Sequence, residues 1–308
     1  MNSKIIEWSN KTESLGRAVV AIGVFDGVHL GHAELLRTAV QRAKELNVDA
    51  VAVTFDRDPE QVVVPDKHVP QLLTLDEKLT YMSDLEIDAI LVVPFDVQIA
   101  EMTPEHFIED VLLGTLDPVE IVVGEDFRFG QHAKGNVELL AGIGPAQGFT
   151  VLPLELLHEG DEPVTATRIR TIIAAGNVTE ATSLLGRSHR VSGTVVHGRG
   201  EGERVIGVPT ANITPWTHAA LPAEGVYAGR ASFRGQEFLA AISVGTPPSF
   251  PSSLDVLEAH LIGFSGDLYG AEVVLEFDER IRDQAIFDAP LKLAEAIQHD
   301  IDYVSGRR

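Results

Sequence analysis

Short apolar runs alternate with longer amphipathic segments through the first half of the chain. Continuous apolar runs are typical of strands buried on both faces, and apolar residues at three- and four-residue spacing are typical of helices. The predicted strands are 18–25, 50–55, 89–95, 119–124 and 149–154, and the predicted helices are 32–46, 75–85 and 103–113. This alternation predicts an α/β fold with a parallel, doubly wound sheet, whose ligands bind at the carboxyl ends of the strands.

The pattern changes near residue 187, where helical periodicity stops and glycines and prolines become frequent. Short strand-like pieces recur beyond this point, which predicts an antiparallel β-barrel. Two short helical pieces, 167–176 and 178–186, precede the change, and a last helix is predicted over 290–304. We therefore expect two domains, residues 1–186 and residues 187–308.

Composition narrows the class of protein. The chain has 46 acidic and 24 basic residues, a formal net charge of −22, which argues against a general nucleic-acid binder. It contains no cysteine, so disulfides, zinc-thiolate sites and a cysteine nucleophile are excluded. No apolar run approaches the roughly 20 residues of a membrane span, and the first residues lack the pattern of a secretory signal. We expect a cytoplasmic protein with small-molecule substrates, monomeric or weakly homo-oligomeric, that binds neither nucleic acid nor membrane.

A turn rich in glycine and histidine follows the first predicted strand directly. It reads G-V-F-D-G-V-H-L-G-H over residues 23–32. Gly27 and Gly31 allow the backbone to approach a ligand, while His29, His32 and a helix N-terminus supply hydrogen-bond donors. These features favour a phosphate site. A metal site held by the two histidines and a plain strand-to-helix turn are the alternatives.

The turn resembles the signature of the nucleotidylyltransferase superfamily, and the longer pattern is similar to its FAD synthetase branch, which implies a Rossmann-like domain. Similar segments follow in the family's order at 54–56, 123–130, 134–136 and 165–170. The resemblance implies that His29 and His32 bind ATP phosphates and stabilise the charge that develops on the leaving pyrophosphate. The other implied contacts are Gly23, Phe25, Gly31, Thr167 and Arg168 for ATP, and Asp126 and Phe127 for the flavin.

Several of these residues have a plainer interpretation. Taken alone, Arg168 is better explained as a solvent-facing helix residue, and Asp126 with Arg128 as a surface ion pair. Their predicted place at strand-to-helix transitions, on the edge that holds the histidines, favours the functional interpretation. The chain departs from the family at Asp58, where a histidine is usual, and at Ala166, where a serine is usual. The carboxylate of Asp58 bears on the strength or specificity of adenylylation.

A second group of motifs follows residue 190. Glycines alternate at Gly198, Gly200 and Gly202, and their N–H groups could fold over phosphates, although a plain hairpin loop is the alternative. A P-T-A-N segment comes next. Thr210 and Asn212 are two residues apart, so on an extended segment they point to the same face and can offer two neutral oxygens to Mg²⁺.

This half resembles the riboflavin kinase domain, whose G-V-Y-x-G, E-x-H and D-L-Y-G segments stand at 225–229, 258–260 and 267–270. The resemblance implies that Glu258 is the general base for the ribityl 5′-hydroxyl; the alternative is an outward strand residue paired with a lysine or arginine. The other implied roles are Mg-ATP ligation by Thr210 and Asn212, ATP contacts by Gly198, Gly200, Gly202 and Pro209, and flavin contacts by Tyr227 and Arg282.

Together the two resemblances have the order found in prokaryotic bifunctional riboflavin kinase/FAD synthetases. The expected reactions are riboflavin plus ATP to FMN plus ADP at the barrel, then FMN plus ATP to FAD plus pyrophosphate at the sheet. Magnesium is expected to serve both. Two other hypotheses remain: a riboflavin kinase with an impaired adenylylation site, and a flavin- or nucleotide-binding protein without turnover.

Overall fold

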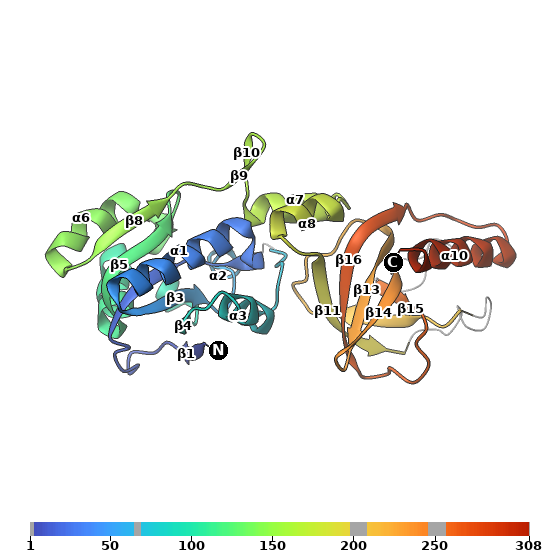
Figure 1. Cartoon of the computed structure of the whole chain (residues 1–308), viewed down its shortest axis with the longest axis horizontal. Coiled ribbons are helices and arrows are strands. Elements are labelled where there is room, and N and C mark those ends of the chain that lie inside the picture. Colours follow the sequence, from blue (N-terminus) through green and yellow to red (C-terminus); the bar gives the residue numbers. More distant parts are fainter. Residues whose placement is uncertain (1–2, 65–68, 198–207, 246–256, 308) are drawn as a thin grey trace. The chain divides into compact units, whose positions relative to one another are not determined.

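The computed structural model describes residues 3–64, 69–197, 208–245 and 257–307. The chain divides into two compact units (Figure 1). The first comprises Met1–Val69 and Leu75–Thr165, and the second comprises Pro70–Thr74 and Ala166–Arg308. Helices α7 (Ala166–Ala174) and α8 (Val178–Leu185) therefore belong with the barrel, although the predicted domain boundary lies after them. That boundary stays a prediction.

The first unit is built on a six-stranded sheet in the order β1-β4-β3-β2-β5-β8. Every neighbouring pair is parallel, as the alternation of strands and helices predicts. The strands are β1 (Lys4–Glu7), β2 (Arg17–Ile22), β3 (Asp49–Phe55), β4 (Ala89–Val93), β5 (Asp117–Gly124) and β8 (Thr150–Leu154). The edge strand β1 was not predicted, because four residues with two isoleucines give too short a pattern.

Helices and short elements connect these strands. They are η1 (Asp26–Val28), α1 (Leu30–Leu46), α2 (Glu60–Val63), α3 (Leu75–Ser83), α4 (Val97–Ala100), α5 (Pro104–His106), the π-helix η2 (Phe107–Leu113), β6 (Arg128–Phe129), η3 (Gln131–Ala133), β7 (Gly135–Asn136), α6 (Val137–Gln147), β9 (His158–Glu159) and β10 (Glu162–Pro163). The middle strands are almost entirely apolar and buried, and α1 packs on β2, β3 and β5. The core therefore lies along the centre of the sheet.

The second unit contains a closed antiparallel barrel in the order β11-β12-β15-β14-β13-β16, closed by pairing of β16 with β11. Its strands are β11 (His189–Val196), β12 (Ala211–Pro215), β13 (Gly225–Phe233), β14 (Gln236–Val244), β15 (Leu257–Leu261) and β16 (Glu272–Arg282). The last helix, α10 (Pro290–Ser305), packs on β13 and β14 (Figure 1). The predicted barrel and terminal helix are confirmed.

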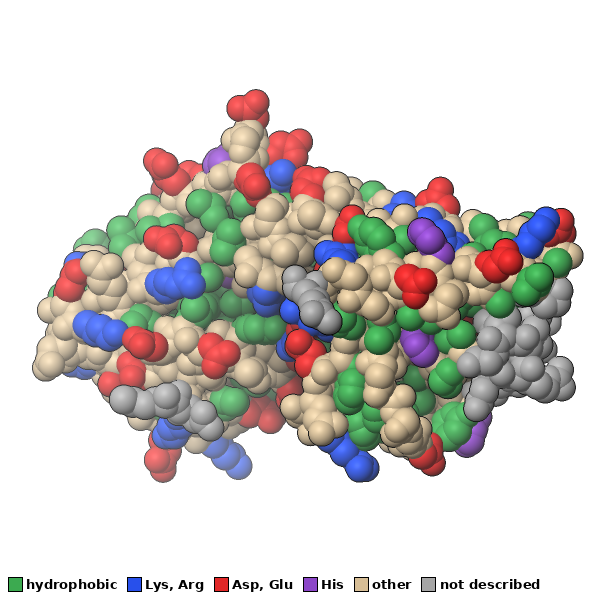
Figure 2. Space-filling model, turned by 45° about the vertical axis from the view of Figure 1, so that its right-hand side comes forward, with side chains coloured by type: hydrophobic (Ala, Val, Ile, Leu, Met, Phe, Trp, Pro, Cys, Tyr) green, Lys and Arg blue, Asp and Glu red, His purple; other side chains and the backbone are tan. Residues whose placement is uncertain are grey.

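Charge is spread over the surface. Figure 2 shows acidic and basic side chains interspersed on the face in view, as expected for a chain with many of both and an acidic excess. Within the described ranges, no helix combines the length and the apolar character that a membrane crossing requires.

An ion pair with one buried partner fastens α10 to the barrel. Nη2 and Nε of Arg282 lie 2.7 and 3.1 Å from the two carboxylate oxygens of Asp300, which is 3% exposed. Removing one partner of a buried pair leaves the other charge uncompensated. We expect Asp300→Ala to lower the free energy of unfolding of the second unit by about 3 kcal/mol in denaturant titrations.

The same helix offers a matched control. Asp288 pairs with Lys292 at 2.9 Å, but both side chains are exposed. Asp288→Ala should therefore change the free energy of unfolding by less than about 0.5 kcal/mol. Equal effects of the two substitutions would show that burial of the Arg282–Asp300 pair does not matter.

Candidate active sites

The turn between β2 and α1 has a strained backbone. Phe25, Gly27 and Val28 adopt left-handed conformations, with φ of 53°, 77° and 37°. Glycine does so freely, but this conformation is unfavourable for phenylalanine and for a β-branched valine. Such strain persists only where the surrounding structure fixes the backbone, and it concentrates at functional sites.

The turn brings its two histidines together at the N-terminus of α1. Nδ1 of His29 accepts a hydrogen bond from the His32 N–H at 3.3 Å and so caps the helix. The two rings stack with their centroids 3.6 Å apart, and Phe25 meets His32 edge-on. Nδ1 of His32 is buried and has no hydrogen-bond partner within the part of the chain that the structure describes. The cap and the stacking fix both imidazoles at the N-terminus of α1, where backbone N–H groups lack partners within the helix.

Burial lowers the pKa of His32 well below its ordinary value, and the neighbouring His29 and Lys78 lower the pKa further. A hydrogen bond with the Asp26 backbone opposes these effects only in part. His32 is therefore neutral near pH 7, where it acts through hydrogen bonds and not as a cation.

Two glycines that are predicted to contact ATP also lie against aromatic side chains of the turn. A Cβ at Gly23 would lie 2.9 Å from the Phe25 ring, and a Cβ at Gly31 would lie 3.3 Å from the His29 ring. These glycines make room for the aromatic side chains of the turn. Contacts of Gly23 and Gly31 with ATP stay predictions.

The carboxyl ends of β3 and β5 lie beside the end of β2, because the three strands are adjacent and parallel. Asp126 follows β5 and is exposed, whereas Phe127 is half-buried and stacks on Phe129 with ring centroids 5.4 Å apart. Asp58 follows β3 and is buried; its Oδ1 accepts the Glu60 N–H at 2.9 Å at the start of α2. The carboxylate at this position, where the chain departs from the family pattern, therefore has a backbone hydrogen-bond partner at the start of α2.

Thr167 and Arg168 open α7, which belongs to the second unit. Arg168 does not face solvent as the plainer interpretation expected: its side chain is 18% exposed and its Nη2 lies 3.6 Å from Oε1 of Glu180. That these two residues act together with the histidine turn stays a prediction.

On the barrel, strand register places Asn212, Glu258 and Ser243 in one row. Asn212 of β12 and Ser243 of β14 each pair with Glu258 of β15, so the three side chains share one face. This is the outer face, because Leu257 and Ala259 point into the core. Oδ1 of Asn212 is buried and lacks a hydrogen-bond partner among the described residues. The predicted magnesium ligand and the predicted base therefore stand side by side.

A histidine fastens the P-T-A-N segment to this row. Nδ1 of His260, two residues beyond Glu258, lies 2.8 Å from the Pro209 carbonyl oxygen. A carbonyl only accepts, so Nδ1 is the donor. The bond positions Pro209 and Thr210 just before β12 begins at Ala211.

The other predicted residues of the kinase site do not belong to the row of Asn212, Glu258 and Ser243. Tyr227 is fully buried in the barrel core, packs edge-on against Phe277 and donates to the Ala223 carbonyl at 2.5 Å. Arg282 is engaged by Asp300. Flavin contacts by these two residues stay predictions. Gly198, Gly200 and Gly202 lie outside the described residues.

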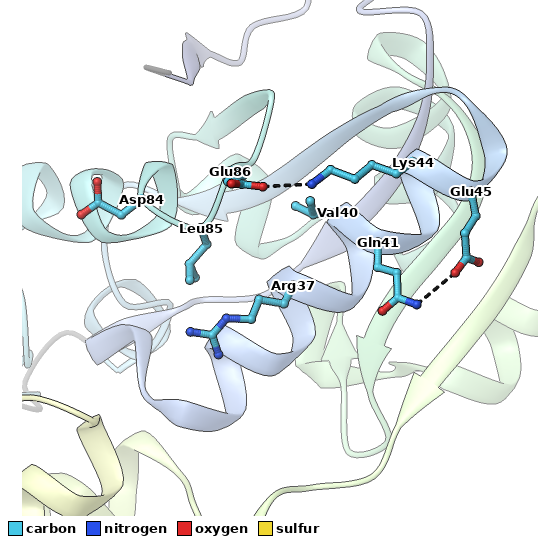
Figure 3. Close-up of a pocket in the computed structure, with 8 residues that line it drawn as sticks. All are labelled: Arg37, Val40, Gln41, Lys44, Glu45, Asp84, Leu85 and Glu86. Atoms are coloured by element: carbon cyan, nitrogen blue, oxygen red, sulfur yellow. Dashed lines mark hydrogen bonds and ion pairs between the residues drawn. The ribbon is translucent and has the colours of Figure 1, made fainter.

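A surface depression of the first unit lies away from the histidine turn (Figure 3). It is lined by Arg37, Val40, Gln41, Lys44, Glu45, Asp84, Leu85 and Glu86. Lys44 is twelve positions beyond His32 on α1, about 18 Å along the axis at 1.5 Å per residue. Its ammonium pairs with Glu86 at 2.9 Å, as Figure 3 shows. None of the predicted site residues lines this depression.

Sequence reasoning missed one residue that contacts the histidine turn. Lys78 of α3 is buried and 6% exposed, and its Nζ donates to the carbonyls of Val24 and Phe55. The signal was present: Lys78 lies on the helix face formed by Leu75, Leu79 and Met82, where an apolar residue is expected.

The family models and the similar sequences agree on one family. Residues 11–168 match the family model described as FAD synthetase, and residues 185–306 match the one described as riboflavin kinase. The bifunctional riboflavin kinase/FMN adenylyltransferase of Escherichia coli strain K12 is 35% identical, over 92% of this chain and 90% of its own. The protein of the same description from Bacillus subtilis strain 168 is 33% identical, over 96% and 95%.

One solved structure covers 99% of both chains with a TM-score of 0.86 and 29% identity; it is described as a macrolide-efflux protein from Streptococcus pneumoniae. The two matched models define a chain that joins an FAD synthetase domain to a riboflavin kinase domain. The chain belongs to the bifunctional riboflavin kinase/FMN adenylyltransferase family. The resemblance found in the sequence is confirmed.

Proposed function

We propose that the chain makes FMN at the barrel and FAD at the histidine turn. In the first step the riboflavin 5′-hydroxyl oxygen bonds to the γ-phosphorus of ATP, its proton passes to Glu258, and ADP leaves. In the second step a phosphate oxygen of FMN bonds to the α-phosphorus of another ATP, and pyrophosphate leaves. Membership of the family supports both activities.

The observation that carries the kinase assignment is the row of Asn212, Glu258 and Ser243. The Glu258 carboxylate is half-buried and lies next to Oδ1 of Asn212, which has no hydrogen-bond partner among the described residues. A proton acceptor beside a group that can hold a cation supports phosphoryl transfer at this row. His260 adds to this support, because its bond to Pro209 fastens the segment that carries Thr210 and Asn212 to the strand of Glu258.

Magnesium fits the same row. Mg²⁺ prefers oxygen ligands, and the Oδ1 atom of Asn212 is a buried oxygen that accepts no hydrogen bond from the residues that the structure describes. Thr210 would supply the second oxygen. Bound there, the ion would neutralise charge on the ATP phosphates. Among the residues that the structure describes, no cluster of three or more His, Asp or Glu side chains is placed to hold a metal.

The histidine turn suits adenylylation for a different reason. His29 and His32 stand at the N-terminus of a seventeen-residue helix, where free N–H groups and the helix dipole favour phosphate. His29 and the neutral imidazole of His32 add donors that can stabilise charge on departing pyrophosphate. We further propose that the protein works in the cytoplasm, as a monomer or weak homo-oligomer, without nucleic acid or membrane. Its acidic net charge supports the proposed absence of nucleic-acid binding, because it repels the phosphate backbone.

A magnesium titration tests the assignment. Riboflavin and ATP should yield FMN and ADP, then FAD and pyrophosphate, when products are separated by chromatography; EDTA should stop both steps. Asn212→Ala should raise the Mg²⁺ concentration for half-maximal FMN formation about ten-fold, equivalent to a loss of about 1.4 kcal/mol of ion binding. FAD formation from supplied FMN should not change.

The exposed Gln236 of β14 provides the control, and Gln236→Ala should leave the magnesium requirement unaltered. An unshifted requirement in Asn212→Ala would show that this amide does not hold the ion. Equal shifts in both reactions would show that the barrel row is not specific to phosphorylation.

A further inference from the structure

Lys78 is the most unusual charged residue of the first unit. Lysine is almost never fully buried, because removing an ammonium from water costs several kcal/mol. Burial accordingly lowers the pKa of Lys78 to about 8, while the negative charges of Asp26, Asp56 and Asp58 oppose that shift. An apolar residue would suit the buried face of α3 better, so the ammonium must meet another requirement at this position.

The hydrogen bonds of Lys78 indicate that requirement. Its Nζ lies 2.6 Å from the Phe55 carbonyl oxygen, at the end of β3, and 3.1 Å from the Val24 carbonyl oxygen, just after β2. The Thr54 hydroxyl donates to the same Val24 oxygen at 3.0 Å. One ammonium therefore joins the carboxyl ends of two neighbouring strands, one step beyond the backbone bond from the Gly23 N–H to the Val53 carbonyl at 3.1 Å.

The Val24 carbonyl immediately precedes the strained turn. Phe25 follows with φ of 53°, and the left-handed Gly27 and Val28 come before His29. A strained backbone relaxes unless its ends are held. The two groups that donate to the Val24 carbonyl, Lys78 Nζ and the Thr54 hydroxyl, therefore fix the start of the turn. Through the turn they also fix the positions of the stacked imidazoles.

We propose that Lys78 is a positioning residue for FMN adenylylation, which holds the ends of β2 and β3 together behind the turn that carries His29 and His32. This inference rests on the proposed assignment of that turn to the adenylylation step. Lys78 does not need to touch ATP or FMN. Its loss should displace the histidines where charge develops on pyrophosphate, and a displacement of about 1 Å in such a site can cost about 100-fold in rate.

Kinetics of Lys78→Met test the inference. Methionine keeps the length and apolar stem of the side chain but removes the donors. We expect kcat for FAD formation from FMN to fall about 10- to 100-fold with the KM values for FMN and ATP nearly unchanged, because ground-state binding depends less on exact placement. Riboflavin phosphorylation in the same sample should be unaffected. An unchanged kcat, or a raised KM alone, would overturn the inference.

Lys44→Met is the matched control, because Lys44 is an exposed lysine of α1 whose only described ion pair is with Glu86. It should leave both activities at the level of the parent protein. The chain has two tryptophans, Trp8 and Trp216, and Trp8 packs against the core of the sheet. In a Trp216→Phe background, Trp8 fluorescence therefore reports whether the first unit of each variant is folded.

Should Lys78→Met fail to fold, Thr54→Val tests whether the bonds to the Val24 carbonyl support FAD formation. It is nearly isosteric and removes only the second donor to the Val24 carbonyl. We expect a smaller fall in kcat for FAD formation, about 3- to 10-fold, the effect of losing one hydrogen bond of about 1 kcal/mol. No fall would contradict the inference. In a folded double variant the two effects should be less than additive, because both donors act on one carbonyl.

A spectroscopic measurement separates positioning from general stability. The charge of Lys78 lowers the pKa of His32, so the pKa of His32 followed by NMR should rise in Lys78→Met and stay unchanged in Lys44→Met. Among the described residues, the other groups that shift the pKa of His32 are His29 and the Asp26 backbone, which neither variant removes. An unmoved pKa would contradict the placement of the ammonium. If His29→Ala and His32→Ala retain FAD formation, the assignment of the turn fails instead.

Discussion

His29→Ala and His32→Ala are each expected to reduce FAD formation from FMN about 100- to 1,000-fold, the usual cost of removing one preorganised group that stabilises transition-state charge. The rings stack at 3.6 Å, so loss of one also removes support for the other. His29 additionally caps α1 through the His32 N–H. The measurement is the initial rate of FAD and pyrophosphate release with FMN supplied directly.

Phosphorylation of riboflavin by the same preparations is the internal control, because its proposed site lies in the other unit. His106→Ala is the external control; His106 is an exposed histidine at the end of α5. If both histidine variants made FAD at the parental rate, the turn would be a structural strand-to-helix connection. If phosphorylation fell equally, the two reactions would not be separated as proposed.

Glu258→Gln is expected to reduce FMN formation about 100- to 10,000-fold, the range that general-base catalysis contributes. Glutamine keeps the shape of the side chain beside Asn212 and Ser243 but cannot take the proton of the 5′-hydroxyl. FAD formation from added FMN should persist. With riboflavin as the only flavin, both products should therefore disappear, and added FMN should restore FAD.

Glu237→Gln provides the comparison for this prediction, because Glu237 is exposed on the neighbouring strand β14. It should not alter FMN formation. Parental FMN formation by Glu258→Gln would exclude Glu258 as the base and would favour the simpler interpretation of an outward strand residue.

Much of the fold could be predicted from the sequence, because local patterns determine it. Buried parallel strands are apolar throughout, so β3 and β4 stand out as continuous runs. The barrel was recognisable from short strands and frequent glycines. The strand β1 was not, since its place at the sheet edge depends on pairing with β4, more than eighty residues away.

The candidate sites were predictable as motifs but not as geometry. The sequence places His29 three residues before His32, yet the stacking depends on left-handed residues that no motif specifies. The bond from His260 to Pro209 joins segments fifty-one residues apart. Lys78 was missed because its hydrogen bonds run to backbone carbonyls, which the sequence does not identify; its place on the apolar face of α3 was the only signal.

The link between His260 and Pro209 also bears on which side chains position 260 tolerates. The Pro209 carbonyl only accepts, so a side chain at this position must offer a donor where Nδ1 of His260 lies. Asparagine and glutamine carry such a donor, whereas phenylalanine and leucine do not. A main-chain atom fifty-one residues earlier thus constrains the chemistry of a side chain on β15.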